Sequence, residues 1–203
     1  MSAYTLIHQA FYDRPVEDVA RELLGALLCR RTRDGLTVGR IVETEAYLSA
    51  DDSASHSHKG LNRKNASMFG PPGHAYVYTI HARQCFNVVT ESNGVGSAVL
   101  VRAVEPVQGQ ALMSQRRGTD LVRDLCRGPA RLCEAMAIGR ELNGWDLTRG
   151  KQLWIALDHN KEATTNVIIR TSARIGVTSA HDLPLRFFIA RSPFVSGPKT
   201  LNQ

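Results

Sequence analysis

The sequence contains few of the features that mark metal, redox and secreted proteins. Only four cysteines occur in 203 residues, and the closest two, Cys126 and Cys133, are seven positions apart. This spacing excludes a Cys-x-x-Cys zinc or redox motif. On a helix the pair would lie about 10 Å apart, which is too far for a disulfide. We therefore predict four reduced thiols, as in a cytoplasmic protein.

Long hydrophobic runs are also missing. No stretch approaches the roughly 20 apolar residues of a membrane span, and residues 1–11 show neither the basic region nor the apolar run of an export signal. No Gly-x-Ser-x-Gly occurs, which disfavours a serine nucleophile of that type. The Gly-x-Gly at 94–96 has no helix pattern behind it, so it predicts no dinucleotide site. We expect a soluble, cytoplasmic protein with no membrane partner and no cofactor.

Positive charge is present in excess. The chain carries 25 Lys and Arg against 19 Asp and Glu, for a formal net charge of +6 and a pI of about 9.4. Five arginines between residues 116 and 131 face only Asp120 and Asp124 and predict a basic patch, in which Arg127 is a candidate DNA contact. Such a balance favours a polyanionic partner, although many basic proteins bind none.

Periodicity predicts one α+β domain over residues 1–203, with a mainly antiparallel sheet flanked by helices. A 43% hydrophobic chain of this length buries about 70% of its unfolded surface without a metal or disulfide. Residues 49–73 predict a long loop, and at this length such a loop is usually functional. Helices are expected over 15–24, 106–118 and 129–138. Strands are expected over 26–33, 36–47, 75–80, 85–90, 97–104 and 185–189, with 152–157 and 165–171 paired to each other.

The strand at 36–47 carries the most informative motif. In an extended strand Glu43, Glu45 and Tyr47 project to one face, and the residues between them project to the other. Burial of two unpaired carboxylates costs several kcal/mol each. An acidic and aromatic cleft satisfies both residue types, because a carboxylate there has a tuned pKa beside a stacking surface. The alternative is an edge strand with solvated glutamates.

A carboxylate in such a cleft is suited to act as a general base toward water. Hydrolysis of an N-glycosidic bond needs an anion that deprotonates water and stabilises a cationic transition state. Arg102, on a mostly apolar strand, is a candidate to hold that water, with a snorkelling arginine as the equal alternative. A metal site built from Glu43, Asp51 and His58 stays a second possibility, because carboxylates and imidazoles are ligands of hard and borderline cations. A Schiff base from Lys59 or Lys64 is a third.

Aromatic residues complete the pattern. Tyr76 and Tyr78 share one strand face, and together with Tyr47 and His56 they could enclose a planar base taken out of a duplex. A flipped base loses a few kcal/mol of stacking, and stacking on aromatic side chains returns roughly 1 to 3 kcal/mol per base. Weakly paired, damaged bases would then be favoured. Each tyrosine taken alone is more simply a core aromatic.

Ordered motifs from about residue 10 to 197 carry a resemblance to a known family. They include Glu-Thr-Glu-Ala-Tyr at 43–47, Ala-Ser-His at 54–56, Tyr-Val-Tyr at 76–78, Arg-Ala-Val-Glu-Pro at 102–106, Arg-Ile-Gly-Val at 174–177 and Ser-Pro-Phe-Val-Ser at 192–196. Shorter matches lie at 65, 68–69, 72–73, 87 and 125–129. Together they resemble the alkyladenine (3-methyladenine) DNA glycosylase family, which implies a single mixed α/β domain with a curved antiparallel sheet.

The resemblance also implies roles for individual residues. Glu45 matches the general base and Arg102 its partner at the water. Three residues match the enclosure of the flipped base: Tyr47, His56 and Tyr78. Asn87 matches the asparagine that disfavours guanine by crowding its exocyclic amine. The implied reaction is metal-free, monofunctional excision of alkylated or deaminated purines.

The sequence departs from the family pattern at two DNA-binding positions. The intercalating tyrosine normally lies three residues after the position of Tyr78, but His81 stands there, and the segment 79–84 is one residue short. Lys64 stands where an arginine is common and retains the charge without the bidentate fork. The residue that acts as the wedge is therefore open.

We predict a base-excision repair glycosylase that binds double-stranded DNA with damaged purines as a monomer, in the cytoplasm and associated with the nucleoid through DNA. The alternatives are a metal-dependent hydrolase and a lesion-binding protein without catalysis. The sequence does not rank hypoxanthine, 3-methyladenine, 7-methylguanine and ethenoadenine as substrates, and it assigns no role to Glu43.

Overall fold

The longest strand, β3 (Gly35–Tyr47), organises the sheet of this protein. The computed structural model describes residues 4–159, 167–198, 200 and 202. Strand β3 pairs antiparallel with β2 (Leu27–Thr32) along its first half and with β6 (Ser97–Gln108) along most of its length. From Glu43 onward β9 (Arg186–Ile189) replaces β2 as its second neighbour. The end of β3 therefore lies between β6, from the middle of the chain, and β9, from near its C-terminus.

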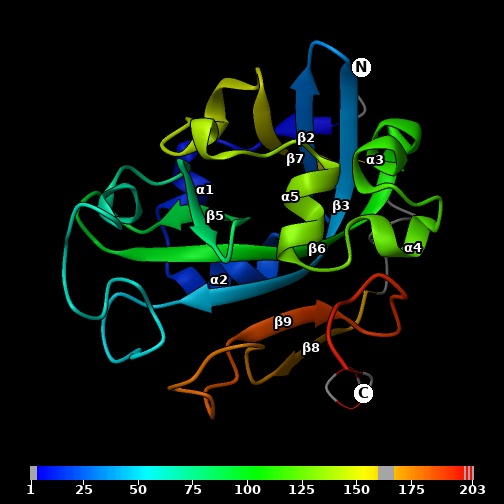
Figure 1. Ribbon diagram of the computed structural model, residues 1–203. Coiled ribbons are helices and arrows are strands. Elements are labelled where there is room, and N and C mark those ends of the chain that lie inside the picture. The colour runs from blue at the N-terminus through cyan, green and yellow to red at the C-terminus, as the bar shows by residue number, and fades with distance from the viewer. Residues whose placement is uncertain (1–3, 160–166, 199, 201, 203) are drawn as a thin grey trace.

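The remaining strands extend the sheet on both sides of this centre. They run in the order β1-β7-β2-β3-β6-β5-β4, and β9 carries β8 on its outer edge. Every described pair is antiparallel. Figure 1 shows that β3 changes direction sharply between its two ends, so the sheet is strongly curved. The additional strands are β1 (Tyr4–Leu6), β4 (Ala75–Ile80), β5 (Arg83–Thr90), β7 (Leu153–Asp158) and β8 (Ile169–Ser172).

Irregular pairing between β3 and β6 accompanies this bend. The register shifts between Val38 and Gly39, and again on each side of Glu43. Such bulges bend a strand and re-aim its side chains, often next to active sites. At Gly39 the strands approach so closely that an added Cβ would lie 2.4 Å from Val104 Cγ2, which explains the glycine there.

Five short α-helices cover the sheet in the described part of the chain. The second and fifth share one strand: α2 contacts β3, β6 and β9, whereas α5 contacts β5 and β6. Both contribute buried side chains to the main core. The helices are α1 (Gln9–Tyr12), α2 (Val16–Glu22), α3 (Gln110–Arg117), α4 (Val122–Leu125) and α5 (Pro129–Ala135). The described residues also form three 3₁₀ helices: η1 (Ala66–Phe69), η2 (Arg140–Leu142) and η3 (Leu147–Arg149).

The predicted α+β class and the mainly antiparallel, curved sheet are confirmed. The predicted pairing of 152–157 with 165–171 is wrong, because β7 pairs with β1 and β2 while β8 pairs with β9; residues 165 and 166 lie outside the described residues. The helix expected from Pro106 begins instead at Gln110, and Pro106 lies in β6. It is tolerated there because β5 pairs only with the first part of β6 and the register is already shifted.

Two further expectations need adjustment. The helix expected over 129–138 ends at Ala135. The turn between β2 and β3 is formed by residues 33 and 34, because Gly35 already pairs with Thr32. Among the helices that the structure describes, none has the length and apolar composition that a membrane crossing requires.

Candidate active site

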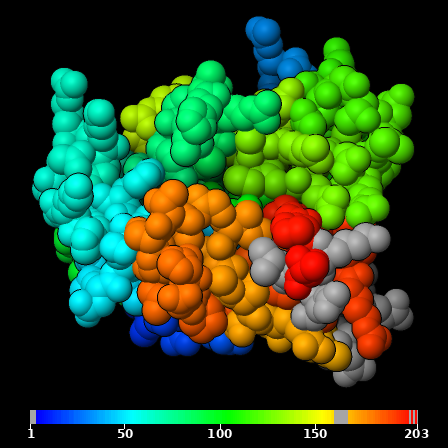
Figure 2. Space-filling view, turned by 60° about the horizontal axis from the view of Figure 1, so that its bottom comes forward, coloured from blue at the N-terminus to red at the C-terminus, as the bar shows by residue number. Residues whose placement is uncertain are grey.

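A cavity of about 210 Å³ opens where the end of β3 meets the loop after it and the segment before β9. Figure 2 shows these two segments side by side on one face of the molecule, the first in cyan and the second in orange. Strands β4 and β5 form the opposite wall. The lining residues are Tyr47, Ser53, Ala54, His56, Met68, Tyr76, Tyr78, Ile80, Asn87, Gly176, Val177, Thr178 and Ser179.

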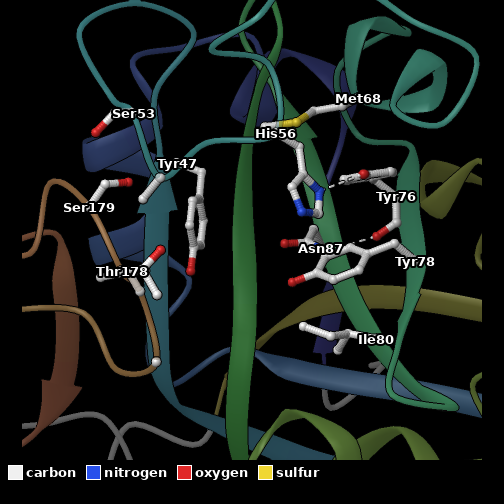
Figure 3. Close-up of a pocket in the computed structure, with 13 residues that line it drawn as sticks. Tyr47, Ser53, His56, Met68, Tyr76, Tyr78, Ile80, Asn87, Thr178 and Ser179 are labelled. Atoms are coloured by element: carbon white, nitrogen blue, oxygen red, sulfur yellow. Dashed lines mark hydrogen bonds between the residues drawn. The ribbon is translucent and has the colours of Figure 1, made fainter.

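Aromatic rings form two facing walls of this cavity. Figure 3 shows Tyr47 on one side and His56 with Tyr78 on the other. The rings of His56 and Tyr78 meet edge to face at 4.6 Å between centroids. His56 Nδ1 is 2.8 Å from the hydroxyl of Tyr76. All three residues that the resemblance assigns to base enclosure therefore line one cavity, and the slot between the walls suits a planar ligand.

Asn87, on β5, also lines this cavity, beside Tyr78. It is buried, and its Nδ2 donates to the backbone carbonyl of Tyr76 at 3.0 Å. Because this bond consumes an amide proton, the orientation of the side chain is fixed.

Glu45 lies behind the wall that Tyr47 forms. Its side chain has no exposed surface, and three donors reach it. Oε1 accepts from the backbone N–H of Ile175 at 2.7 Å, while Oε2 accepts from the Tyr47 hydroxyl at 3.0 Å and from Arg102 Nη1 at 3.1 Å. The structure therefore brings together the two residues predicted as base and partner, immediately adjacent to the cavity.

Burial dominates the electrostatics of this carboxylate. It raises the pKa of Glu45 above the ordinary value, while Arg102, the Ile175 N–H and the Tyr47 hydroxyl oppose the rise. Burial acts to lower the pKa of Arg102, but Glu45 and Glu43 together raise it, so this guanidinium stays charged. A carboxylate with a raised pKa beside a fixed cation is a typical arrangement for a general base.

Burial shifts the pKa of His56 in the opposite direction from that of Glu45. Its ring is exposed on the cavity side, but partial burial lowers its pKa from the ordinary value. The ring is therefore neutral near pH 7, which suits stacking and hydrogen bonding with an uncharged or cationic base better than an imidazolium would.

A second buried ion pair supports the cavity wall from behind. Asp52 receives Arg174 Nη1 and Nη2 at 2.6 Å each, and both side chains are fully buried. The Arg174 guanidinium also lies 4.6 Å from the centre of the Tyr47 ring. Arg174 and Asp52 thus tie the segment before β9 to the loop after β3, across the rear of Tyr47.

The predicted DNA-binding residues lie in three different places. His81 and Ala82 form the two-residue turn between β4 and β5, and both have positive φ, 46° and 61°. This accounts for the short segment 79–84: the hairpin closes with a type I′-like turn, in which such φ values are required. The exposed His81 marks the tip, while Ile80, half exposed, lines the cavity itself.

Lys64 and Arg127 differ from each other in their surroundings. Lys64 is exposed and lines a second cavity of about 590 Å³, which shares His56, Tyr76, Tyr78 and Ile80 with the first. Arg127 is half-buried, and its Nε donates to the Val195 carbonyl at 2.8 Å, so it holds the C-terminal segment. It is not among the residues of either cavity.

The basic patch predicted between 116 and 131 is largely engaged within the protein. Arg117 pairs with Glu134 at 2.6 Å and Arg131 with Asp124 at 3.4 Å. Arg123 Nε donates to a backbone carbonyl at 3.2 Å. These bonds leave less free positive charge in this region than its composition suggests.

The donors of the alternative metal site do not converge. Glu43 is enclosed by arginines, and Asp51 is exposed with a φ of 56°. Within residues 4–159 and 167–198 and the two described positions beyond, no group of three His, Cys, Asp or Glu side chains could hold a metal ion.

Sequence reasoning missed two arginines that pair with buried carboxylates of the site: Arg174 binds Asp52, and Arg186 binds Glu43. Arg174 and Arg186 come from the last quarter of the chain and are fully buried in their side chains. Their only signal was position within or near the motifs at 174–177 and 192–196. Unpaired buried arginines are rare, so Arg186, in the apolar strand-like segment 185–189, could have indicated a carboxylate partner.

Comparison with known proteins identifies the family. The sequence profile of methylpurine-DNA glycosylase (MPG) matches residues 10–193. A relative in Methanoculleus marisnigri is 48% identical over 92% of this chain and 96% of its own, and one in Rhodopirellula baltica is 47% identical over 94% and 83%. Each is named "Putative 3-methyladenine DNA glycosylase". This chain therefore belongs to the methylpurine-DNA glycosylase family.

Proposed function

We propose that this chain, a DNA glycosylase of the 3-methyladenine type that works in DNA repair, flips a damaged purine into the aromatic cavity and hydrolyses its bond to C1′ with a water activated by Glu45. The observation that carries the proposal is the buried Glu45 carboxylate, bonded to Arg102 and Tyr47 immediately behind the cavity wall.

The proposed cavity contacts follow from its shape. Tyr47 would stack on one face of the purine, with His56 and Tyr78 against the other. Stacking of this kind is worth roughly 1 to 3 kcal/mol per base, which offsets the few kcal/mol lost on unstacking. Asn87, fixed by its bond to Tyr76, would crowd the exocyclic amine of guanine and so protect undamaged DNA.

Water needs access to Glu45, whose oxygens are all engaged in the free protein. We propose that the attacking water takes the place of the Tyr47 hydroxyl at Oε2 once a base has displaced that ring. Glu45 then accepts one proton of the water while the water oxygen bonds to C1′. The C1′–N bond breaks, its electron pair leaves with the base, and an abasic site remains. Arg102 keeps the carboxylate aligned throughout.

Substitution of Glu45, the proposed general base, tests this function. Glu45→Gln should bind lesion DNA normally and lose about 10²- to 10⁴-fold in the single-turnover rate of excision. Glu105→Gln is a matched control, because Glu105 lies on β6, pairs with Arg40 at 3.6 Å and has a partly exposed side chain. Undiminished excision in Glu45→Gln would refute the proposal.

Two alternatives give different results in the same assay. A metal-dependent hydrolase would lose activity in EDTA, whereas the Glu45 mechanism is unaffected. A lesion-binding protein would release no free base in a single turnover. Alkali treatment of the product, with a parallel borohydride trap, distinguishes water from an amine as nucleophile: strand cleavage only after alkali and no trapped adduct indicate water.

A further inference from the structure

Glu43 has no part in the mechanism above, yet it is as deeply buried as Glu45, the proposed general base. Its side chain has no exposed surface and lies between the two register shifts of β3. Its oxygens accept from Arg186 Nε at 2.6 Å, from the Ser196 N–H at 2.7 Å and from Arg102 Nε at 3.2 Å. Three donors, two of them guanidinium groups, therefore surround this buried carboxylate.

Arg102 is shared between the two glutamates. Its Nε donates to Glu43 Oε1, while its Nη1 donates to Glu45 Oε2 at 3.1 Å. The planar guanidinium therefore connects Glu43 to Glu45 as a rigid bridge. Rotation of Arg102 away from Glu45 would also break its bond to Glu43.

Arg186 supplies the compensating charge on the far side of Glu43. It lies on β9, opposite Glu45 in the register, but its Nε binds Glu43. Its side chain is fully buried, and its other nitrogens donate to Ser172 Oγ at 2.9 Å and to the Ser196 carbonyl at 3.2 Å. Arg102 and Arg186 together carry two positive charges, and Glu43 and Glu45 carry two negative charges.

We propose that Glu43 and Arg186 are positioning residues that balance the charge around Glu45, so that Arg102 orients the base without weakening it. This inference rests on the proposed function, in which Glu45 activates the water. Loss of Glu43 alone would leave two arginines facing one carboxylate. The excess positive charge would make Glu45 a weaker base and would oppose the cationic transition state.

The charged and titratable groups that face Glu45 come from several elements. Arg102 lies on β6, Glu43 and Tyr47 on β3, Tyr78 on β4, Cys85 on β5, and Arg174 in the segment before β9. Glu43 and Arg186 do not line the cavity, and the bonds described above join the Glu43 carboxylate to Arg186 and Arg102, not to Glu45. They can therefore be changed without removing a proposed catalytic contact.

Opposite substitutions should move the pH dependence in opposite directions. The assay is single-turnover excision of a cationic purine such as 7-methylguanine or 3-methyladenine, because its departure requires no added proton. The acidic limb of the rate then reports the deprotonation of Glu45. Glu43→Gln should move this limb to lower pH, and Arg186→Met should move it to higher pH. A shift of about 1 to 2 pH units is expected for one charge at about 7 Å and an effective dielectric of about 20.

The double variant tests charge balance directly. Glu43→Gln with Arg186→Met removes both charges, leaves no lone buried ion, and should return the limb to the wild-type pH. It also keeps the test valid where a single variant does not fold. Glu43→Gln should in addition lower the plateau rate at least 10-fold. Asp158→Asn, which removes the partner of Arg40 on β7, is the control and should leave the limb unchanged.

The outcomes separate this inference from the function on which it rests. Excision that survives in Glu45→Gln would refute the function. Excision that depends on Glu45 but keeps the same acidic limb in Glu43→Gln and Arg186→Met would refute the charge balance alone. A limb that moves in the same direction in both variants, or that stays displaced in the double variant, would refute it as well.

Discussion

Replacement of Asp52 by asparagine should destabilise the protein strongly, although the change is nearly isosteric. Asp52 is the partner of Arg174, whose side chain has no exposed surface. Both guanidinium bonds to the carboxylate measure 2.6 Å. After the substitution Arg174 would keep the remaining side-chain oxygen of residue 52 and the Ala46 carbonyl, at 3.0 Å, as acceptors, but its second nitrogen would face an NH₂ donor and no counter-charge would be bonded to it.

The expected loss follows from leaving a buried charge without its partner. Such a change costs about 3 to 5 kcal/mol, out of a total stability of about 5 to 15 kcal/mol. For a chain of this size about 2 to 4 °C of Tm corresponds to each kcal/mol, so Asp52→Asn should lower Tm by about 6 to 20 °C. Asp52 also accepts from the Leu48 and Ala54 N–H groups at 3.1 Å, so its loss loosens the loop after β3 as well.

The pH dependence of stability gives an independent check. Burial alone would raise the pKa of Asp52, but the bonds from Arg174 and from the Leu48 and Ala54 N–H groups hold it below the ordinary value. The unfolded chain therefore binds a proton at higher pH than the folded one does. The stabilisation is complete above the unfolded pKa of about 4 and is lost as the pH falls through the lower folded pKa. The difference in unfolding free energy between wild type and Asp52→Asn should therefore decrease as the pH falls from the unfolded to the folded pKa of Asp52.

Urea unfolding followed by circular dichroism measures these differences. Glu22→Gln is the control, because the Arg14–Glu22 pair is also short, at 2.8 Å, but has side chains 34% and 51% exposed. It should cost less than about 1 kcal/mol. Asp52→Asn combined with Arg174→Met should recover part of the loss, since both ions are then absent. A loss in Asp52→Asn no larger than that in Glu22→Gln would refute the reasoning.

Two smaller changes test the fold and the cavity. Gly39→Ala should cost about 1 to 3 kcal/mol in urea unfolding, because the new Cβ meets Val104 Cγ2 at 2.4 Å; Val104→Ala in the same chain should restore part of it, and an unchanged midpoint in Gly39→Ala would contradict the close approach. Tyr76→Phe should weaken binding of lesion DNA severalfold through loss of the 2.8 Å bond to His56, with little change in the single-turnover rate; equal affinity would show that this bond does not order His56.

The fold class followed from local patterns, whereas long-range pairing did not. Alternation and turn residues predicted β2 through β6 within a few positions, because hairpin neighbours are close in sequence. Strands β7 and β8 were assigned to each other for the same reason, and this was wrong. Strand β7 pairs with β1 and β2, more than 100 residues earlier, and only tertiary packing determines that partner.

For the site as well, local patterns predicted some features and missed those that depend on a partner strand. Strict alternation placed Glu43, Glu45 and Tyr47 on one face, and the bond from Tyr47 to Glu45 agrees with it. The same rule placed Val42 with Ala46 on the other face, but the two belong to different clusters because the register shifts beside Glu43. A bulge depends on the partner strand, so alternation within one strand cannot predict it.

The burial of Glu45 explains why the site needs more arginines than the chemistry does. A base of raised pKa requires a dry environment, but a dry environment penalises every charge in it. The structure meets this conflict with three carboxylates, Glu43, Glu45 and Asp52, against three guanidinium groups, Arg102, Arg174 and Arg186. The exchange of β2 for β9 beside β3 makes this possible, because it brings Arg186 and the segment of Arg174 to the bulged end of β3. Substitution of one of these six charged residues therefore alters both the stability of the protein and the protonation of Glu45. Substitution of a carboxylate together with its arginine partner should alter mainly the local packing.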